Sequence, residues 1–150
     1  MSDQEYDRFL SPHFRLSEFS VSRNYPHLVT PLYQIPRVCV ERIRLLCEFV
    51  LEPLRFQLQA AVRITSCFRN PELNFKEGGV QNSDHLFRGD AAAVDFVIPP
   101  HAPIEIAGTI AKSKILFAYI ITYIHRGFLH YSIPHLGETR RGVSIVDLSK

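Results

Sequence analysis

The chain has 150 residues, of which 46% are hydrophobic and 21% charged, so it can bury one sizeable core and does not resemble a disordered protein in composition. Its 17 basic and 15 acidic residues give a formal net charge of +2, and the basic residues are scattered, which gives no reason to expect a nucleic-acid partner. The longest apolar run, 115–124, is about half as long as a membrane span, and the acidic start at 1–7 has no feature of a Sec signal peptide. We therefore expect a single domain over 1–150 with no membrane span.

The first 35 residues are rich in Ser, Pro and His. We predict that 1–35 form an arm with a short helical turn at 16–19. The apolar side chains of Phe14, Leu16 and Phe19 are expected to pack this arm on the core.

A helical pattern follows from Pro36 to Gln59. Apolar residues recur there at steps of three and four, at Ile43, Leu46, Cys47, Val50, Leu51 and Leu54, while charged residues take the other face. Pro36 suits a first helical turn, and Pro53 is expected to kink or locally break the helix. Cys47 lies on the apolar side and is interpreted as a small buried hydrophobe.

Helices and strands are mixed in the rest of the chain without a regular βαβ alternation. The predicted strands are 62–66, 91–98, 116–123, 128–133 and 143–146. A turn at 69–74 is expected to enter a short helix, and a second helix is predicted over 103–114. A hairpin is expected around 124–127, and the last strand could be an edge. This order favours an α+β fold with a mainly antiparallel sheet and flanking helices.

One acidic residue, Asp95, lies inside an apolar strand. Its neighbours in 91–98 are all apolar, so the strand is predicted to be buried on both faces. A buried carboxylate needs a partner, and a metal, an arginine or a backbone turn would each serve. Asp90 is a competitor, although its place beside Gly89 fits a turn.

Histidines supply the other candidate metal ligands. His85 precedes this strand on a polar loop, and His130 lies in the apolar strand 128–133, where an unpaired imidazole would be costly. His125 falls in the preceding turn, and His135 is expected to be solvated. His85, Asp95 and His130 together could give one zinc three protein ligands and leave its fourth position to water.

Several stretches, in order, are similar to those of a known family. They are the run 44–55, the segment from Arg63 to Asn74, Gly78-Gly79 and Ser83-Asp84-His85, and the opening 11–19 is similar as well. Together they resemble the zinc D-alanyl-D-alanine carboxypeptidases, most of all the small versions from bacteriophages and prophages. The likeness runs from about Ser11 to Ser132.

The resemblance implies a Hedgehog/DD-peptidase-like fold and a zinc ion held by His85, Asp95 and His130. It implies that Arg69 faces the substrate, where a guanidinium can hold a carboxylate or an oxyanion, and that Ser83 supports the site by hydrogen bonding. The implied substrates are peptidoglycan stem peptides, cut by a carboxypeptidase or an endopeptidase. A protein of this kind would be made in the host cytoplasm and act on the cell wall in phage lysis or entry, possible partners being other phage proteins.

The chain departs from the family pattern at two points. The family places the zinc aspartate seven residues after the first histidine, whereas Asp95 follows His85 by ten, and we interpret the difference as an expanded loop ahead of the strand. Asp90 stays open as a substitute. Many relatives also carry a glutamate base shortly before the second histidine, but 119–129 contain no acidic residue.

His125 is the conventional base that this stretch offers, because a neutral imidazole can accept a proton near neutral pH. The sequence thus predicts metal-assisted amide hydrolysis, with His125 as the base and Arg69 on the peptide or the oxyanion. The alternative is a cell-wall or virion binding module that keeps the fold without cutting.

Overall fold

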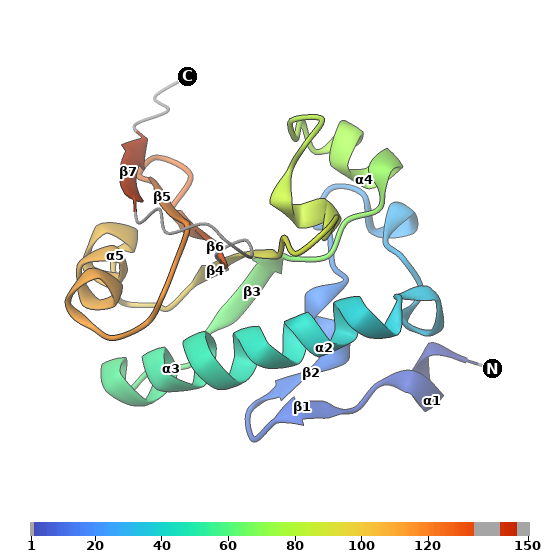
Figure 1. The fold of residues 1–150 in the computed structure, drawn as a ribbon, viewed down its shortest axis with the longest axis horizontal. Coiled ribbons are helices and arrows are strands. Elements are labelled where there is room, and N and C mark those ends of the chain that lie inside the picture. The colour runs from blue at the N-terminus through green and yellow to red at the C-terminus, as the bar shows by residue number, and fades with distance from the viewer. Residues whose placement is uncertain (1, 134–141, 147–150) are drawn as a thin grey trace.

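The computed structural model describes residues 2–133 and 142–146 and has helices on the flanks of a mainly antiparallel sheet (Figure 1). The α-helices are α1 (Asp3–Tyr6), α2 (Arg37–Leu46), α3 (Glu52–Leu58), α4 (Pro71–Lys76) and α5 (Pro103–Lys112). The strands are β1 (Phe9–Ser11), β2 (Phe14–Arg15), β3 (Arg63–Ser66), β4 (Ala93–Val97), β5 (Tyr119–Tyr123), β6 (Phe128–Ser132) and β7 (Gly142–Val146). Single turns of 3₁₀ helix form η1 (Leu16–Phe19), η2 (Pro26–Leu28), η3 (Leu32–Gln34) and η5 (Asp84–Leu86), and η4 (Cys47–Leu51) is a π-helical turn.

Within the described residues, five strands form the main sheet in the order β3-β4-β6-β5-β7, and β1 and β2 form a separate small hairpin. Neighbouring strands of the main sheet are antiparallel, except that β5 and β7 are parallel. The predicted hairpin around 124–127 joins β5 to β6, and the predicted last strand lies at the sheet edge as β7. The expectation of an α+β fold with a mainly antiparallel sheet is confirmed, and the finer Hedgehog/DD-peptidase class stays a prediction.

The helix predicted over 36–59 forms as one helical segment made of α2, η4 and α3. Pro36 stands just before its first turn, where a missing N–H costs no intrahelical hydrogen bond. Pro53 lies in the first turn of α3, directly after η4. Because proline has no N–H and its ring crowds the preceding turn, the wider π-helical turn accommodates Pro53 without ending the helix.

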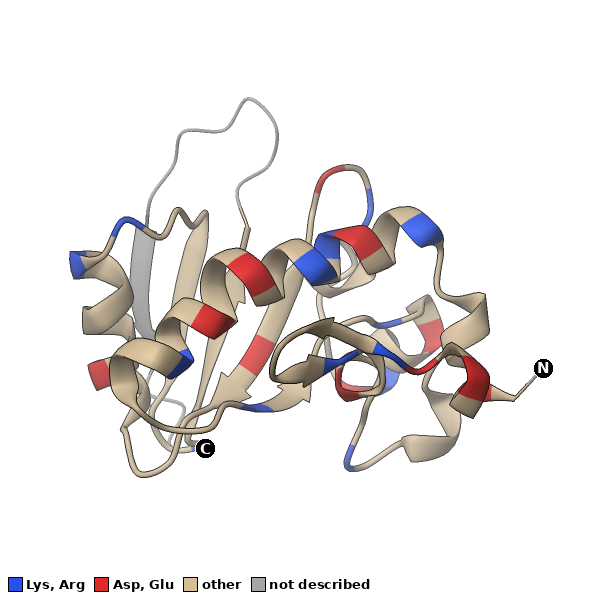
Figure 2. Ribbon diagram, turned by 90° about the horizontal axis from the view of Figure 1, so that it is seen from below, with Lys and Arg blue, Asp and Glu red and all other residues tan. Residues whose placement is uncertain are grey.

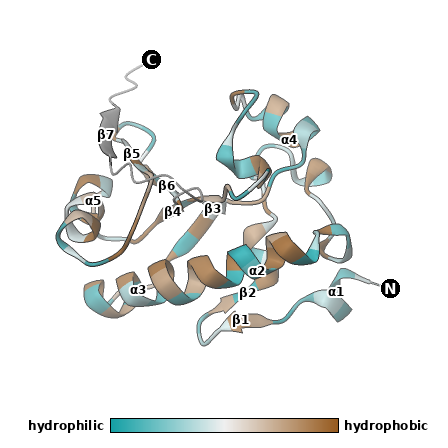
Figure 3. Cartoon of the chain, in the orientation of Figure 1, coloured by the Kyte–Doolittle hydropathy of each residue, from teal (hydrophilic) through white to brown (hydrophobic). Residues whose placement is uncertain are grey.

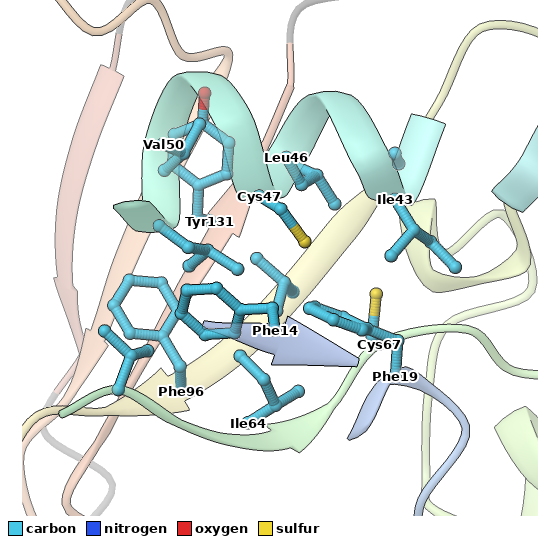
Figure 4. Packing of buried hydrophobic residues seen from close by; sticks show 14 of the residues in the cluster. Phe14, Phe19, Ile43, Leu46, Cys47, Val50, Ile64, Cys67, Phe96 and Tyr131 are labelled. Atoms are coloured by element: carbon cyan, nitrogen blue, oxygen red, sulfur yellow. The ribbon is translucent and has the colours of Figure 1, made fainter. Parts of the chain in front are cut away.

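The hydrophobic core lies between this helical segment and the sheet. Figure 4 shows Leu46 and Cys47 of the helical segment in the same interior as Phe14 of the N-terminal arm, Phe96 of β4 and Tyr131 of β6. Each of these five side chains is at most 1% exposed. Burying a side chain of this size stabilises a fold by about 1.5–3 kcal/mol relative to leaving it in water, so the three layers hold one another in place.

The N-terminal arm also fixes the chain that leaves β3. Its turn η1 forms where the sequence predicts one, and Leu16 and Phe19 are buried. The backbone N–H of Phe68 donates to the carbonyl oxygen of Phe19 at 2.9 Å. The arm therefore anchors the stretch between β3 and α4, which carries Arg69.

Acidic and basic residues are interspersed along the ribbon in Figure 2, consistent with the small net charge. Figure 3 shows hydrophobic and hydrophilic residues alternating along α2 and α3, as expected for helices with one buried side. In the part of the chain that the structure describes, no helix combines the length and the apolar character that crossing a membrane requires.

Strand alternation separates the core from a cleft on the other face of the sheet. Along β4, Val94 and Phe96 belong to the core, whereas Asp95 lines the cleft. Along β6, Leu129 is in the core and His130 lines the cleft. Because successive strand residues point to opposite faces, both candidate ligands come to one surface.

Candidate metal centre

His85 lies in the 3₁₀ turn η5, and its side chain is buried. The hydroxyl of Ser83 caps this turn by accepting from the backbone N–H of His85 at 3.2 Å. In the ring, Nδ1–H donates to the carbonyl oxygen of Cys67 at 2.7 Å, because a carbonyl can only accept. That bond orients the ring and leaves Nε2 as the nitrogen that faces Asp95 Oδ1, at 3.2 Å.

Asp95 and His130 are cross-strand partners on β4 and β6. His130 Nδ1 lies 2.8 Å from the same Asp95 oxygen, Oδ1, that faces His85. On the other side of the ring, Nε2 of His130 lies 2.8 Å from the hydroxyl oxygen of Ser132. The imidazoles meet edge to face, with ring centroids 5.1 Å apart.

These three residues fit a zinc ion by donor type, by spacing and by outer contacts. Their ligand atoms all lie within 4.8 Å of one another, whereas ligands 2.0–2.1 Å from a tetrahedral zinc are about 3.4 Å apart. Each histidine has a hydrogen-bonding partner for its other ring nitrogen, which is the usual arrangement around metal-bound imidazoles. His85 Nε2 and His130 Nδ1 both face the same oxygen, Asp95 Oδ1, so the three donor groups converge on one position.

Asp95 is ionised in this setting. Burial by itself would raise the pKa of the Asp95 carboxyl, but the charge and hydrogen bonds of His85 and His130 outweigh burial and hold that pKa well below its ordinary value. The carboxylate is the form that binds a cation.

Arg69 holds the other side of the Asp95 carboxylate. Its Nη2 lies 3.6 Å from Asp95 Oδ2, and its side chain is only 11% exposed. Nε–H donates to the hydroxyl oxygen of Ser66 at 2.9 Å, and Nη1–H donates to Asn74 Oδ1 at 3.3 Å. The guanidinium is therefore held between the end of strand β3, which carries Ser66, and helix α4, which carries Asn74.

Asn74 is itself held in place by the loop that follows α4. Its side-chain Nδ2 donates to the carbonyl oxygen of Val80 at 2.9 Å, and its backbone carbonyl oxygen accepts from the backbone N–H of Gly79 at 2.8 Å. A Cβ on Gly79 would lie 2.1 Å from Asn74 Oδ1, so only glycine permits this approach. The predicted Gly78-Gly79 loop thus supports Arg69 through Asn74.

The cluster opens into a cleft of about 940 Å³. Its charged lining residues are Arg23, Arg63, Arg69, Arg126, Glu77, Asp84 and Asp95. Ser83 lines it as well. A separate cavity of about 790 Å³ lies between the arm and α3 and contains none of the cluster residues. The cleft, and not this second cavity, is the place where a substrate would meet the cluster.

The remaining predicted site residues lie elsewhere. Asp90 is exposed in the turn after Gly89, so of the two aspartates considered, Asp95 is the one that meets the histidines. His125 is exposed in the turn between β5 and β6 and is not among the described residues that line the cleft. His135 lies outside the described residues.

Sequence reasoning misjudged or missed three features of the site. His85 was predicted on a polar loop, but it lies in the turn η5 and is 3% exposed. Ser132 was not selected, although it follows His130 by two residues and so shares its strand face. The Cys67 carbonyl gave no signal in the sequence, because any residue there would supply one.

Comparison with known proteins identifies a protein family whose model matches this chain. The family model described as Peptidase M15 matches residues 24–132, which include the cluster and Arg69. Searches of the curated proteins and of the solved structures find no match to this chain.

Proposed function

The chain belongs to the peptidase M15 family, and from this premise we propose that it hydrolyses an amide bond in peptidoglycan stem peptides with a zinc ion bound by His85, Asp95 and His130. The finer assignment, a small phage-type D-alanyl-D-alanine carboxypeptidase or endopeptidase, rests on the sequence resemblance. The observation that carries the proposal is the cluster itself. It combines the buried imidazole of His85, the partly buried imidazole of His130 and the ionised carboxylate of Asp95 at the floor of an open cleft.

When zinc is bound, it supplies a Lewis acid for the scissile carbonyl and lowers the pKa of water toward about 7. The protein's own contribution is to orient the ligands. The Cys67 carbonyl fixes the ring of His85, and Ser132 contacts the ring of His130. Arg69 contacts Asp95 Oδ2, which leaves Oδ1 to the two histidines.

Arg69 has a second proposed role toward the substrate. Its guanidinium lines the cleft beside the cluster. A cation in that position stabilises negative charge that develops on a carbonyl oxygen during hydrolysis. The guanidinium needs no rearrangement to do so, because its hydrogen bonds to Ser66 and Asn74 already hold it in place.

Three residues are candidates for the proton acceptor. The sequence predicts His125. Two further candidates are the carboxylates of Asp84 and Glu77, which line the cleft. Separate His125→Ala, Asp84→Asn and Glu77→Gln variants distinguish them, because loss of a general base lowers kcat by about 10²–10⁴ while zinc stays bound. A normal kcat in the His125→Ala variant would remove His125 from the mechanism.

The experiment that tests the function is digestion of purified peptidoglycan and synthetic stem peptides, with product masses read by mass spectrometry. We expect cleavage that stops with a chelator and returns with added zinc, and that is absent in His85→Ala. His27→Ala is the matched control, because His27 is exposed and does not line the cleft. Bound zinc with no hydrolysis of any stem peptide would contradict the enzyme and select the binding module.

A further inference from the structure

One end of the cleft floor is an aromatic shelf, which we define as Val97, Phe128 and Tyr123. All three line the cleft. Tyr123 and Phe128 are cross-strand partners on β5 and β6, and because Phe96 pairs with Leu129, Val97 occupies the next register position beside Phe128. The shelf therefore crosses β4, β6 and β5 in one row.

This row lies beside the metal cluster. Asp95 and His130 are paired two residues along the same strands, a separation of about 7 Å. An extended peptide advances about 3.3 Å per residue, so a substrate with its scissile bond at the cluster would extend about two residues onto the shelf.

The shelf is largely apolar. The rings of Tyr123 and Phe128 stack with centroids 4.5 Å apart and planes 18° from parallel. Both side chains are partly exposed to the cleft, as is Val97. Such a surface favours the aliphatic or planar part of a substrate residue over a hydrated charge.

Two arginines lie beside the row. Arg63 on β3 is the cross-strand partner of Val97, and the guanidinium of Arg126 lies over the ring of Phe128, 5.2 Å from its centroid. Both arginines are exposed, line the cleft and make no ion pair with any described residue. Arg69 differs from them because Asp95, Ser66 and Asn74 already engage it.

The acidic lining residues do not neutralise this end. Asp95 belongs to the cluster, and Glu77 and Asp84 come from other segments, directly after α4 and in η5. Glu77 also accepts a hydrogen bond from the hydroxyl of Ser22. The shelf thus combines an apolar floor with a surplus of positive charge.

We propose that the aromatic shelf, with Arg63 and Arg126, is a substrate subsite for a residue that carries a carboxylate on an aliphatic stem, about two residues from the bond that is cut. The stem packs on the stacked rings, and the carboxylate pairs with the two guanidinium groups. This inference rests on the proposed function, since it takes the cluster as the place of cleavage.

The test compares the synthetic stem pentapeptide with a series in which one carboxylate at a time is replaced by its carboxamide. For one position we expect the acid to exceed the amide by about tenfold in kcat/KM, mostly through KM, because one charge-assisted pair is at stake. The Arg63→Gln/Arg126→Gln double variant should reduce this ratio to near one. The Arg8→Gln/Arg37→Gln double variant changes two exposed arginines outside the cleft, removes the same two charges and should leave the ratio unchanged.

Two outcomes separate this inference from the function on which it rests. Cleavage with no acid-over-amide preference, or a preference that survives in the double variant, overturns the subsite and leaves the peptidase intact. If no peptide is cut, calorimetric binding of the same acid and amide pair decides: tighter binding of the acid that is lost in the double variant supports the subsite, and equal binding overturns it.

Discussion

Replacing Gly79 by alanine should destabilise the protein by way of Asn74. The φ angle of Gly79 is not positive, unlike that of Gly78, so the backbone accepts an alanine and the cost comes from the new Cβ alone. That Cβ would lie 2.1 Å from Asn74 Oδ1 and 2.7 Å from its Cγ, and Asn74 is buried. The amide group must leave its position.

The expected loss of stability follows from the hydrogen bonds that the Asn74 amide would lose when it moves. Asn74 would lose a neutral bond to the Val80 carbonyl, worth about 1 kcal/mol, and a bond from the Arg69 guanidinium. The latter is charge-assisted but long at 3.3 Å, so we assign it the low end of its range, about 1.5 kcal/mol. Gly79→Ala should therefore lower the free energy of unfolding by about 2–3 kcal/mol.

Urea unfolding followed by circular dichroism measures this change, and a double-mutant cycle tests its cause. In an Asn74→Ala background the same Gly79→Ala change should cost little, because the clashing amide is gone. Gly108→Ala is the matched control: it lies inside α5 with open space around it, and there alanine should stabilise by about 1 kcal/mol. If Gly79→Ala cost the same with and without the Asn74 amide, the proposed contact would not be the reason.

Three further variants or reagents probe the site and the core. Asp95→Asn keeps the shape but removes the anionic ligand, so zinc affinity measured by competition with a chelating dye should fall by more than about a hundredfold; an unchanged affinity would exclude Asp95 as a ligand. Ser132→Ala removes the contact to His130 Nε2 and should weaken zinc by about 10- to 100-fold, and a wild-type affinity would show that this contact does not orient the ring. Burial raises the pKa of the Cys47 thiol to about 12, so the reactive thiolate is scarce until the pH approaches 12. Iodoacetamide should then label Cys47 at pH 8 in urea but not in the folded protein, and fast labelling without urea would contradict its burial.

The parts of the fold that local patterns determine were predictable. Short apolar runs predicted the strands that carry Asp95 and His130, and three- and four-residue spacing predicted the helical segment that covers the core. Pro53 was expected to disturb that helix, and η4 precedes it. Each of these features depends on residues close together in the sequence.

The parts that depend on distant contacts were not predictable. Nothing local indicates that His85 is buried, because its burial depends on Cys67, 18 residues away, and on a cross-strand register. The hydrogen bond between Arg69 and Asn74 likewise depends on how closely the loop that contains Gly79 approaches the side chain of Asn74. The pairing of Tyr123 with Phe128 in the aromatic shelf follows from the β5–β6 register. A one-residue slip of that register would have turned the side chains of one strand to the other face of the sheet.

The zinc content of the purified protein, measured by elemental mass spectrometry beside His130→Ala and the control His27→Ala, tests the metal centre with the fewest assumptions. We predict about one zinc per chain in the wild type and in His27→Ala, and none in His130→Ala. No zinc in the wild type after reconstitution, or equal zinc in His130→Ala, would contradict a metal centre formed by His85, Asp95 and His130.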